Sequence, residues 1–518
     1  MALTTVKGSV DQVLDTIADL QALSSDTGTR VEILGHTTIG DGGEGVFYRD
    51  DADTTSVDNN GTIIVDNLGK RWKRLYSGII NVKWFGAVGD NVADDTVAIQ
   101  TAIDTVAGST REGGIVYVDA GKYKTTATIT LYDGITLLGA GRSKENEAAL
   151  DLGATTFIGT HTGAAVISLK GTINCKLSNF AIESDTTTYP KTGLLLGRDS
   201  SASAGHHYFE FIKIQGKFSQ AAIYSIASEV NTWIDVYVWN LAGAGKYGFY
   251  TSASDDLSVD TLTTSTNLVQ DLTSLYVVNA STDADAACIY MALSESMGSW
   301  NFYNAYLIPY AGSYVQMHNT TDSQVLGPIS FYGGSGERLS GGDPTYGFKI
   351  SSDVSLSFKG FTAIGCRFDF QAGATHYTIN IDSNTTLFTP NVVLQVPEAF
   401  PYALATYTRT NIKGGIFKVG REYEWTAVTL AGAWVNEFGS PYVQAEYTVD
   451  GEGRVKLRGR VTTGTGTITT LPTNYRPSND MFFFQGSNIL LLTSAGVLSL
   501  FSGTAPVDLG IVNFVAEN

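Results

Sequence analysis

The chain has 518 residues, of which 43% are hydrophobic and only 16% charged, with 56 glycines but 11 prolines. This composition excludes extensive disorder and favours many short strands joined by tight turns. The formal net charge of −18 argues against nucleic acid and against an anionic membrane surface as partners, because both bind through clustered Lys and Arg.

The three cysteines, Cys175, Cys288 and Cys366, are far apart and odd in number. They form neither a disulfide framework nor a metal-binding knuckle, so we expect no metal, no other cofactor and folding in a reducing cytoplasm. Residues 1–8 lack the apolar core of a signal peptide, and no apolar run approaches membrane-spanning length. We therefore expect a protein made in a host cytoplasm, which could still leave the cell on a virion.

The chain opens on an apolar pattern that predicts a short helix. Val10, Val13, Ile17 and Leu20 are spaced by 3, 4 and 3 residues, as in the seam of a coiled coil. An amphipathic helix lying on a neighbouring element would give the same spacing, and two turns do not decide between them.

A β-rich module is predicted for residues 28–78. It contains the turn GDGGEG, the strand VFYRD, the turn DNNG, the strand TIIVD and then GKRWKRL. The first turn is not a phosphate loop, because no Lys-Ser or Lys-Thr follows it and no helix starts there. The order of a glycine-rich turn, an aromatic strand and a closing G-x-R-W-x-R resembles the small module that precedes the β-helix in many phage tailspikes.

Residues 82–141 begin with VKWFGAVGD and ADDTVAIQ and continue through GGIVYVDAGKY. Asp94 or Asp95 is placed to cap a helix, with apolar positions at Val97, Ile99, Ala102, Ile103 and Val106. After this helix the period changes to that of strands. The segment resembles the start of pectate-lyase-like β-helices, where a helix covers the open end of the coil. Asp90, Asp94 and Asp95 are therefore interpreted as structural rather than as a metal site.

One apolar pattern then recurs: an anchor, two variable residues, an apolar residue, one variable residue and a last apolar residue. Its copies are Leu177-Phe180-Ile182, Phe209-Ile212-Ile214, Trp233-Val236-Val238, Leu272-Leu275-Val277, Phe302-Ala305-Leu307, Leu326-Ile329-Phe331, Phe361-Ile364-Cys366 and Leu387-Pro390-Val392. A further short strand, such as TGLLLG or YGFYTS, lies between copies. No unit can bury its apolar residues alone, so stacking into a continuous core is predicted. The predicted fold is all-β, a right-handed parallel β-helix.

Stacked rungs place equivalent residues about 4.8 Å apart. Outward positions between the last two apolar residues of successive copies include Lys213, Tyr237, Tyr276 and Tyr306. The consecutive tyrosines predict an aromatic strip. Such a strip suits stacking against pyranose rings or packing against a neighbouring subunit.

The rung pattern stops near Pro401. The strand from Gly453 to Gly459 and the later LPTNYRP resemble the C-terminal β-sandwich of phage fibre and spike proteins. The expected domains are an attachment module over residues 1–80, a β-helix over 81–395, a linker over 396–435, and a β-sandwich over 436–518 that trimerises the chain or binds carbohydrate.

These resemblances imply a homotrimeric phage tailspike on the virion tail, attached through its N-terminus to baseplate or tail proteins. It would act at the bacterial surface on a capsule, exopolysaccharide or O-antigen. Hydrolysis of such a polymer needs two carboxyl groups about 5–9.5 Å apart, which neighbouring rungs can supply. The candidates are Glu210, Asp235 and Asp271, which lie beside the anchors of three consecutive rungs.

Further residues are expected to bind the polysaccharide. They are Tyr237, Trp239, Tyr276, Tyr306, Lys213 and, on the longest loop, Asp255 and Asp256. A lyase acting by β-elimination on a uronate remains an alternative, with Lys213 or the pair His206-His207 as its basic groups. A non-catalytic receptor-binding spike is a second alternative. A secreted pectinase fits less well, given the N-terminal module and the fibre-like C-terminus.

Overall fold

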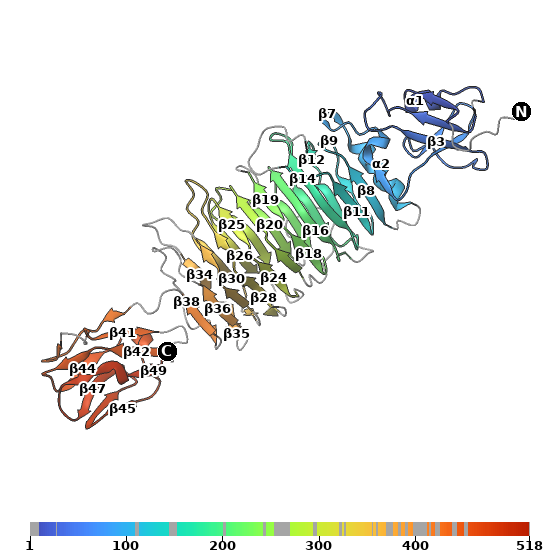
Figure 1. Ribbon diagram of the computed structural model, residues 1–518. Coiled ribbons are helices and arrows are strands. Elements are labelled where there is room, and N and C mark those ends of the chain that lie inside the picture. The colour runs from blue at the N-terminus through green and yellow to red at the C-terminus, as the bar shows by residue number, and fades with distance from the viewer. Residues whose placement is uncertain are drawn as a thin grey trace, which may run out of the picture. The chain divides into compact units, whose positions relative to one another are not determined.

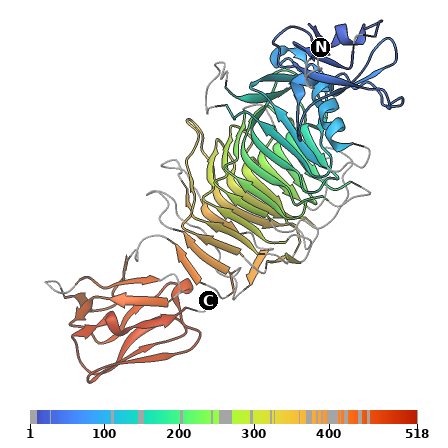
Figure 2. The ribbon, with the colours of Figure 1, turned by 45° about the vertical axis from the view of Figure 1, so that its right-hand side comes forward.

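The computed structural model describes most of the chain, which forms two compact units (Figures 1 and 2). The described residues are 10–26, 28–108, 113–143, 153–199, 204–241, 245–252, 270–293, 298–320, 324–325, 328–354, 356–358, 361–368, 377–381, 385–388, 392–396, 412–413, 416–419, 425–437, 443–449 and 454–516. The first unit comprises residues 1–357, 368–385 and 402–407, and the second comprises 358–367, 386–401 and 408–518.

The N-terminal module is a five-stranded sheet with one short helix. Its elements are β1 (Gln12–Leu14), α1 (Ile17–Gln21), β2 (Arg30–Ile33), β3 (Gly45–Asp50), β4 (Ile63–Val65) and β5 (Arg71–Arg74), with strand order β1-β2-β3-β5-β4. The helix predicted from residue 10 is wrong in extent, because residues 12–14 pair with β2 and Val13 is 54% exposed. Thr16 and Asp19 form a capping box that starts α1 only at Ile17.

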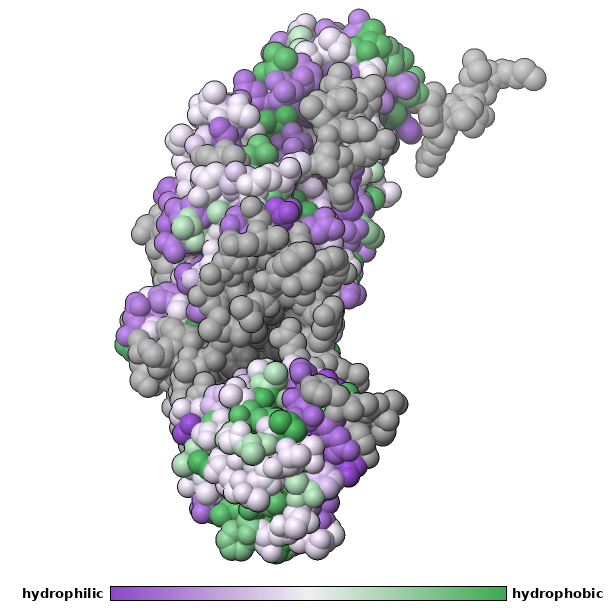
Figure 3. All heavy atoms as spheres, turned by 90° about the vertical axis from the view of Figure 1, so that its left-hand side faces the viewer, coloured by the Kyte–Doolittle hydropathy of each residue, from purple (hydrophilic) through white to green (hydrophobic). Residues whose placement is uncertain are grey.

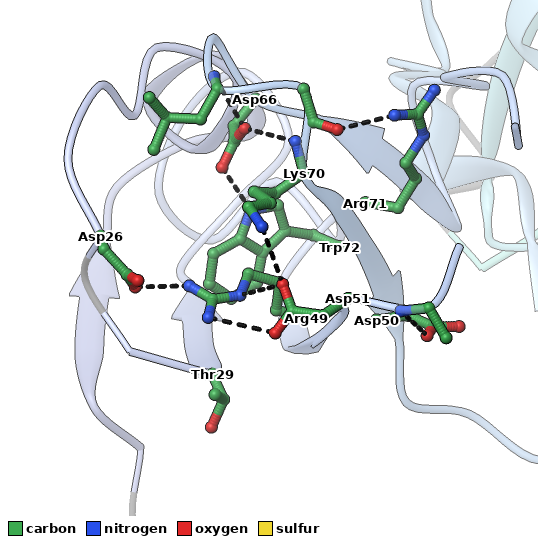
Figure 4. A network of polar contacts seen from close by, with 12 residues as sticks. Asp26, Thr29, Arg49, Asp50, Asp51, Asp66, Lys70, Arg71 and Trp72 are labelled. Carbon is green, nitrogen blue, oxygen red and sulfur yellow. Dashed lines mark hydrogen bonds and ion pairs between the residues drawn. The ribbon is translucent and has the colours of Figure 1, made fainter. Parts of the chain in front are cut away.

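The R-W-x-R motif closes this module through buried polar contacts. Trp72 Nε1 donates to a carboxylate oxygen of Asp66 at 2.9 Å, and Figure 4 shows the surrounding ion pairs of Arg49 with two aspartates. Arg74 is buried and donates to backbone carbonyl oxygens of the two turns, including that of Gly61 at 3.0 Å. Burial lowers the pKa of Arg74 to about 10. The motif therefore fastens the turns to the sheet.

A short 3-10 helix, η1 (Val82–Phe85), strand β7 (Asp90–Asp94) and helix α2 (Thr96–Ala107) precede the β-helix. The buried face of α2 is formed by Ile99, Ala102, Ile103 and Ala107. Val97 is 73% exposed, so its predicted place on that face is wrong. Asp95 accepts hydrogen bonds from the backbone N–H groups of Val88 and Gly89, which accounts structurally for this acidic residue.

The rest of the first unit is a β-helix whose rungs each contribute two arms and a third strand (Figure 1). The arms are β8 (Gly114–Val118), β9 (Gly121–Thr125), β11 (Ile135–Gly139), β12 (Thr155–Gly159), β14 (Lys176–Ser184), β16 (Tyr208–Gly216), β18 (Asn231–Ile234), β19 (Tyr237–Asn240), β21 (Gln270–Thr273), β22 (Tyr276–Asn279), β24 (Trp300–Tyr303), β25 (Tyr306–Pro309), β28 (Ile329–Tyr332) and β29 (Ser335–Gly336). The third strands are β10 (Ile129–Thr130), β13 (Ala165–Lys170), β15 (Thr192–Gly197), β17 (Ala221–Ile226), β20 (Tyr247–Ser252), β23 (Ala287–Ala292), β26 (Ser313–Asn319), β30 (Tyr346–Ser352) and β34 (Tyr377–Ile381). Successive strands pair in parallel, and the predicted right-handed parallel β-helix is confirmed.

The predicted anchors point inward and stack. Phe209, Trp233, Leu272 and Phe302 occupy consecutive rungs in register, and none is more than 1% exposed. The rings of Phe209 and Trp233 stack with centroids 3.9 Å apart. These contacts form the continuous core that the repeat predicted.

One copy of the repeat was placed in the wrong register. Phe302 pairs with Phe331, so Phe331 and not Leu326 is the anchor of that rung. Its second arm carries Gly336 where earlier rungs carry an apolar residue, and the ring of Tyr314 fills the space that a side chain there would take. The apolar pattern of the sequence shifts at this rung because the side chain that fills this part of the core, Tyr314, comes from the third strand β26.

Each rung bends between its two arms at a residue with positive φ. This bend ladder consists of Asn179 (φ 62°), Phe211 (53°), Asp235 (51°), Ser274 (57°), Asn304 (55°) and Gly333 (67°). Left-handed backbone turns the chain sharply without interrupting either arm. The bend ladder therefore forms an outward corner along the β-helix.

The second unit contains short parallel strands and a C-terminal sandwich. Its parallel strands include β32 (Phe361–Ile364), β36 (Val392–Val396) and β38 (Ile416–Val419), together with the pair β35 (Thr385–Phe388) and β37 (Ile412–Lys413). Phe361 pairs with Val392 instead of the predicted Leu387. The antiparallel strands are β39 (Thr426–Ala427), β40 (Val435–Asn436), β41 (Glu446–Val449), β42 (Arg454–Arg458), β43 (Arg460–Thr462), β44 (Gly466–Thr470), β45 (Met481–Gln485), β46 (Asn488–Leu492), β47 (Val497–Ser502), β48 (Val507–Asp508) and β49 (Asn513–Val515). They enclose their own apolar core, which includes Trp434, Leu457, Leu490 and Leu498.

Candidate functional site

The three predicted carboxylates lie on consecutive rungs of the β-helix. Glu210 is on β16, Asp235 is the bend residue between β18 and β19, and Asp271 is on β21. Glu210 pairs with Ile234, so Asp235 is one rung and one residue away, a Cα separation of about 6 Å. Asp271 pairs with Thr232, which puts it one rung and three residues from Asp235, a Cα separation of about 11 Å.

Glu210 is held from the preceding rung by a lysine. Lys176 Nζ lies 3.1 Å from Glu210 Oε2 and 4.9 Å from the centroid of the Tyr208 ring. The Glu210 side chain is 25% exposed. The carboxylate is therefore both accessible and fixed in position.

Asp235 is bound by an arginine that is distant in sequence. The two terminal nitrogens of Arg142 each donate to one carboxylate oxygen at 3.2 Å, and one also donates to the Asp235 backbone carbonyl oxygen at 3.0 Å. The Asp235 side chain is still 39% exposed. This forked contact fixes the direction of both oxygens, while the rung itself supplies the bend.

Asp271 has a neutral contact instead of a cation. Asn301 Nδ2, on the next rung, donates to Asp271 Oδ1 at 2.9 Å. This contact occupies one of the two carboxylate oxygens. The three carboxylates thus have different surroundings on one face.

The predicted tyrosine strip forms, but part of it is covered. The rings of Tyr237 and Tyr276 stack with centroids 4.6 Å apart, and those of Tyr276 and Tyr306 stack at 4.9 Å. Tyr237 is only 3% exposed and Lys213 only 1% exposed, with Lys213 Nζ donating to Ser143 Oγ. The expectation that Tyr237 and Lys213 are accessible to a polysaccharide is therefore corrected. Their positions face outward, but the segment that carries Ser143 lies against them.

The remaining predicted residues divide into half-buried and undescribed ones. Trp239, Tyr276 and Tyr306 are half-buried. Burial and a hydrogen bond to Glu337 raise the pKa of the Tyr306 hydroxyl. Asp255 and Asp256 lie outside the described residues.

Two of the three basic groups considered for a lyase, His207 and Lys213, are buried, whereas His206 is exposed. His207 is 2% exposed and its Nδ1 accepts a hydrogen bond from the Cys175 backbone N–H. Lys213 is buried as described above. Within the described ranges, no group of at least three His, Cys, Asp or Glu side chains is arranged to hold a metal ion.

Three contributors to this surface were not predicted from the sequence. Arg142 contacts Asp235 across 93 residues of sequence, and no short-range pattern marks such a pair. Tyr303 and Tyr332, which are 38% and 37% exposed, lie outward beside the bend ladder. Each of these tyrosines directly follows the anchor of its rung, Phe302 or Phe331. If Phe331 had been chosen as the anchor, the sequence would therefore have predicted that Tyr303 and Tyr332 lie side by side.

Comparison with known proteins assigns both parts of the first unit. Residues 13–77 match the family described as phage tail protein small four-stranded beta-sheet domain. Residues 79–284 match the family described as rhamnogalacturonase A/epimerase, pectate lyase-like. The chain therefore carries a match to a phage-tail β-sheet domain followed directly by a match to a pectate-lyase-like domain. The two resemblances inferred from the N-terminal module and from residues 82–141 are thereby confirmed.

Individual relatives align with small parts of this phage-tail and pectate-lyase-like chain. Mannuronan C5-epimerase AlgE6 of Azotobacter vinelandii is 48% identical over 68 residues, which are 12% of this chain and 8% of the epimerase. The Mu-like prophage FluMu defective tail fiber protein of Haemophilus influenzae is 31% identical over 117 residues, 22% of this chain and 18% of the relative. The chain thus spans less than a fifth of these relatives' lengths.

Two solved structures extend along nearly the whole chain at low identity. The enzymatically active domain of bacteriophage CBA120 tailspike protein 4 is 12% identical, with a TM-score of 0.49 and coverage of 97% of this chain and 74% of that one. Tailspike protein gp49 of Acinetobacter baumannii bacteriophage Fri1, described as a capsular polysaccharide depolymerase, is 12% identical, with a TM-score of 0.44 and coverage of 95% and 96%. Within the described part of the chain, no helix is both long and apolar enough to cross a membrane.

Proposed function

We propose that this chain is a phage tailspike that binds a bacterial surface polysaccharide and hydrolyses it at internal glycosidic bonds. The observation that carries the proposal is the set of carboxylates Glu210, Asp235 and Asp271 on consecutive rungs of one outward face. The phage-tail domain and the pectate-lyase-like β-helix support it, as do relatives whose names describe tail fibres and polysaccharide-modifying enzymes.

The surroundings of the carboxylates support a different role for each. Asp271, with one oxygen on the neutral Asn301 amide, is the general acid that protonates the glycosidic oxygen. Asp235, with both oxygens oriented by Arg142, is the anionic partner that activates water. Their Cα separation of about 11 Å leaves room for the wider carboxyl spacing of inverting enzymes, about 6.5–9.5 Å, if both side chains reach toward the substrate. Glu210, nearer to Asp235, is the alternative acid and would make the enzyme retaining.

The test is polysaccharide cleavage by the full-length protein and its amide variants. We expect Asp235→Asn and Asp271→Asn each to lower kcat by a factor of about 10²–10⁴, the usual value of a positioned acid or base. Asparagine also tolerates positive φ, so Asp235→Asn should keep the bend and the sugar affinity. Glu210→Gln should lower kcat less than either.

The products separate the alternatives. Hydrolysis yields reducing ends without a new double bond, whereas a lyase yields unsaturated products that absorb near 235 nm. A receptor-binding spike would bind the polymer and release no oligosaccharide. If Asn at both aspartates and Gln at Glu210 leave the rate within threefold of the wild-type value, catalysis lies elsewhere on the chain.

We also propose a homotrimer on the virion tail, attached to baseplate or tail proteins through the N-terminal module. The C-terminal sandwich exposes Phe482, Phe484 and Phe501 at 50%, 70% and 62%, and Figure 3 shows hydrophobic side chains on its surface. A sheet face of this kind is suited to burial between copies. Light scattering should give three times the chain mass of 55.3 kDa, and Phe484→Ser should weaken assembly. A stable monomer would contradict the trimer.

A further inference from the structure

A second outward ladder runs beside the bend ladder, and its residues differ sharply in size. This corner ladder consists of Glu210, Ile234, Thr273, Tyr303 and Tyr332, which pair in that order on consecutive rungs. Thr273 is exposed, and both tyrosines are more than one third exposed. Unlike the strip that contains Tyr237, the corner ladder therefore presents aromatic rings to solvent.

Among the described residues, the two tyrosines leave one ring face without a stacking partner. Their rings stack with centroids 5.3 Å apart and planes 13° apart, so Tyr332 occupies one face of Tyr303. The other face of Tyr303 is directed along the ladder toward Thr273, whose side chain is short. We call the space above Thr273 on this face the slot. One rung step is about 4.8 Å, which is within the range of ring stacking distances.

Polar groups surround this slot on both sides. Asp271 and Asn301 lie two residues before Thr273 and Tyr303 on the same strands and are joined by their hydrogen bond. On the bend side, Ser274 and Asn304 are exposed. Hydroxyl, amide and carboxylate groups of this kind bind sugar hydroxyls, and they place the general acid proposed above at the rim of the slot.

The charges near the slot favour an uncharged sugar. The cations described on this face next to the proposed acids, Lys176 and Arg142, contact Glu210 and Asp235 respectively. A uronate in the slot would meet the Asp271 carboxylate without either cation. The net charge of −18 adds long-range repulsion toward a polyanion.

We propose that the free face of Tyr303 is a stacking platform that binds a neutral pyranose ring above Thr273, beside Asp271. This inference rests on the proposed polysaccharide hydrolase and names its substrate-binding subsite and sugar class. Stacking of a sugar on one aromatic ring excludes water from that face and fixes the ring plane. Tyr303 thereby positions the residue whose glycosidic oxygen the acid protonates.

The test uses exopolysaccharide purified from a bacterial strain on which the wild-type protein produces a clearing zone. We expect Tyr303→Ala to raise KM at least tenfold with kcat changed less than threefold, and Tyr303→Phe, which retains the ring, to restore most of the affinity. Thr273→Trp should fill the slot and raise KM similarly. Tyr48, an equally exposed tyrosine of the N-terminal module at 38%, provides the control Tyr48→Ala with unchanged kinetics.

The outcomes distinguish this inference from the proposed function. If wild-type protein cleaves the polymer but Tyr303→Ala keeps KM within twofold, the platform is overturned and the hydrolase stands. A fall in oligomeric state of Tyr303→Ala with unchanged KM would make the ladder a subunit contact and also overturn it. A cleaved polymer composed only of uronic acids would overturn the neutral-sugar assignment. No cleavage or binding by wild-type protein would remove the proposed function itself.

Discussion

At the scale of single residues, His207 is a buried group whose ionisation in mild acid is tied to folding. It is buried in the β-helix, where its backbone N–H donates to Asn231 Oδ1. Burial lowers its pKa to about 3, and the neighbouring His206 adds to the effect. In the unfolded chain the same group titrates near 6.5. The unfolded state therefore binds a proton that the folded state does not, from about pH 6.5 down to about pH 3.

This difference predicts a loss of stability in mild acid. The contribution of neutral His207 is fully present above pH 6.5 and falls as pH falls, by about 2 kcal/mol between pH 7.5 and pH 5. His207→Asn keeps an acceptor for the Cys175 N–H but does not titrate, so this part of the pH dependence should disappear. Urea unfolding at both pH values measures it. His206→Asn, at the exposed neighbour, should retain the wild-type pH dependence, and equal slopes in all three proteins would contradict the assignment.

The sequence could predict which side chains of the candidate site point outward, but not which of them are accessible. The outward positions of Glu210, Asp235 and Asp271 could be predicted because each lies within two residues of an apolar anchor whose direction is fixed by the core. The covering of Lys213 could not be found, because its partner Ser143 is 70 residues away and belongs to a segment without periodicity. Outward direction follows from a local pattern, whereas accessibility depends on distant loops.

At the scale of elements, each rung is held by apolar anchors and by buried amides at its turns. The anchors were predictable because stacking repeats one apolar pattern. The pattern failed where Gly336 leaves its space to Tyr314 and in the last rung, where Val392 and not Leu387 pairs with Phe361. The turns were not predictable. Asn240 and Asn279 pair on adjacent rungs and are at most 1% exposed, yet asparagine in a sequence marks any turn.

Replacing the buried Asn279 is expected to destabilise the fold more than replacing the half-exposed Asn301. Its Nδ2 donates to the backbone carbonyls of Ala287 and Lys246 at 2.7 and 2.8 Å, and its Oδ1 accepts from Asn240 Nδ2. Asn279→Ala leaves these buried groups unpaired, at about 1–3 kcal/mol each, so the free energy of unfolding should fall by about 3 kcal/mol or more. Asn301→Ala, at a half-exposed residue, is the control, with a loss below about 1 kcal/mol. Equal losses would show that the buried pair Asn240 and Asn279 contributes no more to the free energy of unfolding than an asparagine at the surface.

At the scale of the first unit, the N-terminal module is docked on the start of the β-helix. Arg74 lies over the Trp84 ring, 4.8 Å from its centroid, and Asn59 Nδ2 donates to Thr105 Oγ1 at 3.2 Å. Gly61 lies so close to the Phe85 ring that a Cβ there would approach it to 2.4 Å. The module thus covers apolar residues of the segment next to α2, while its own core remains separate.

Removing the module tests whether it carries chemistry. The truncated chain should begin at Gly78, because β6 (Ile79–Asn81) pairs with β8 and belongs to the β-helix. Asp235 is four rungs from β8, about 19 Å along the helix axis, so kcat/KM on the polysaccharide should stay within twofold of the full-length value. The midpoint temperature of thermal unfolding should fall by several degrees, because Trp84 and Phe85 lose the module that covers them. If the exposed rings cause aggregation of the truncated protein, the double substitution Trp84→Ser and Phe85→Ser should restore its solubility. A truncated protein with native circular dichroism, unchanged oligomeric state and a more than tenfold lower kcat/KM would show that the module takes part in the reaction.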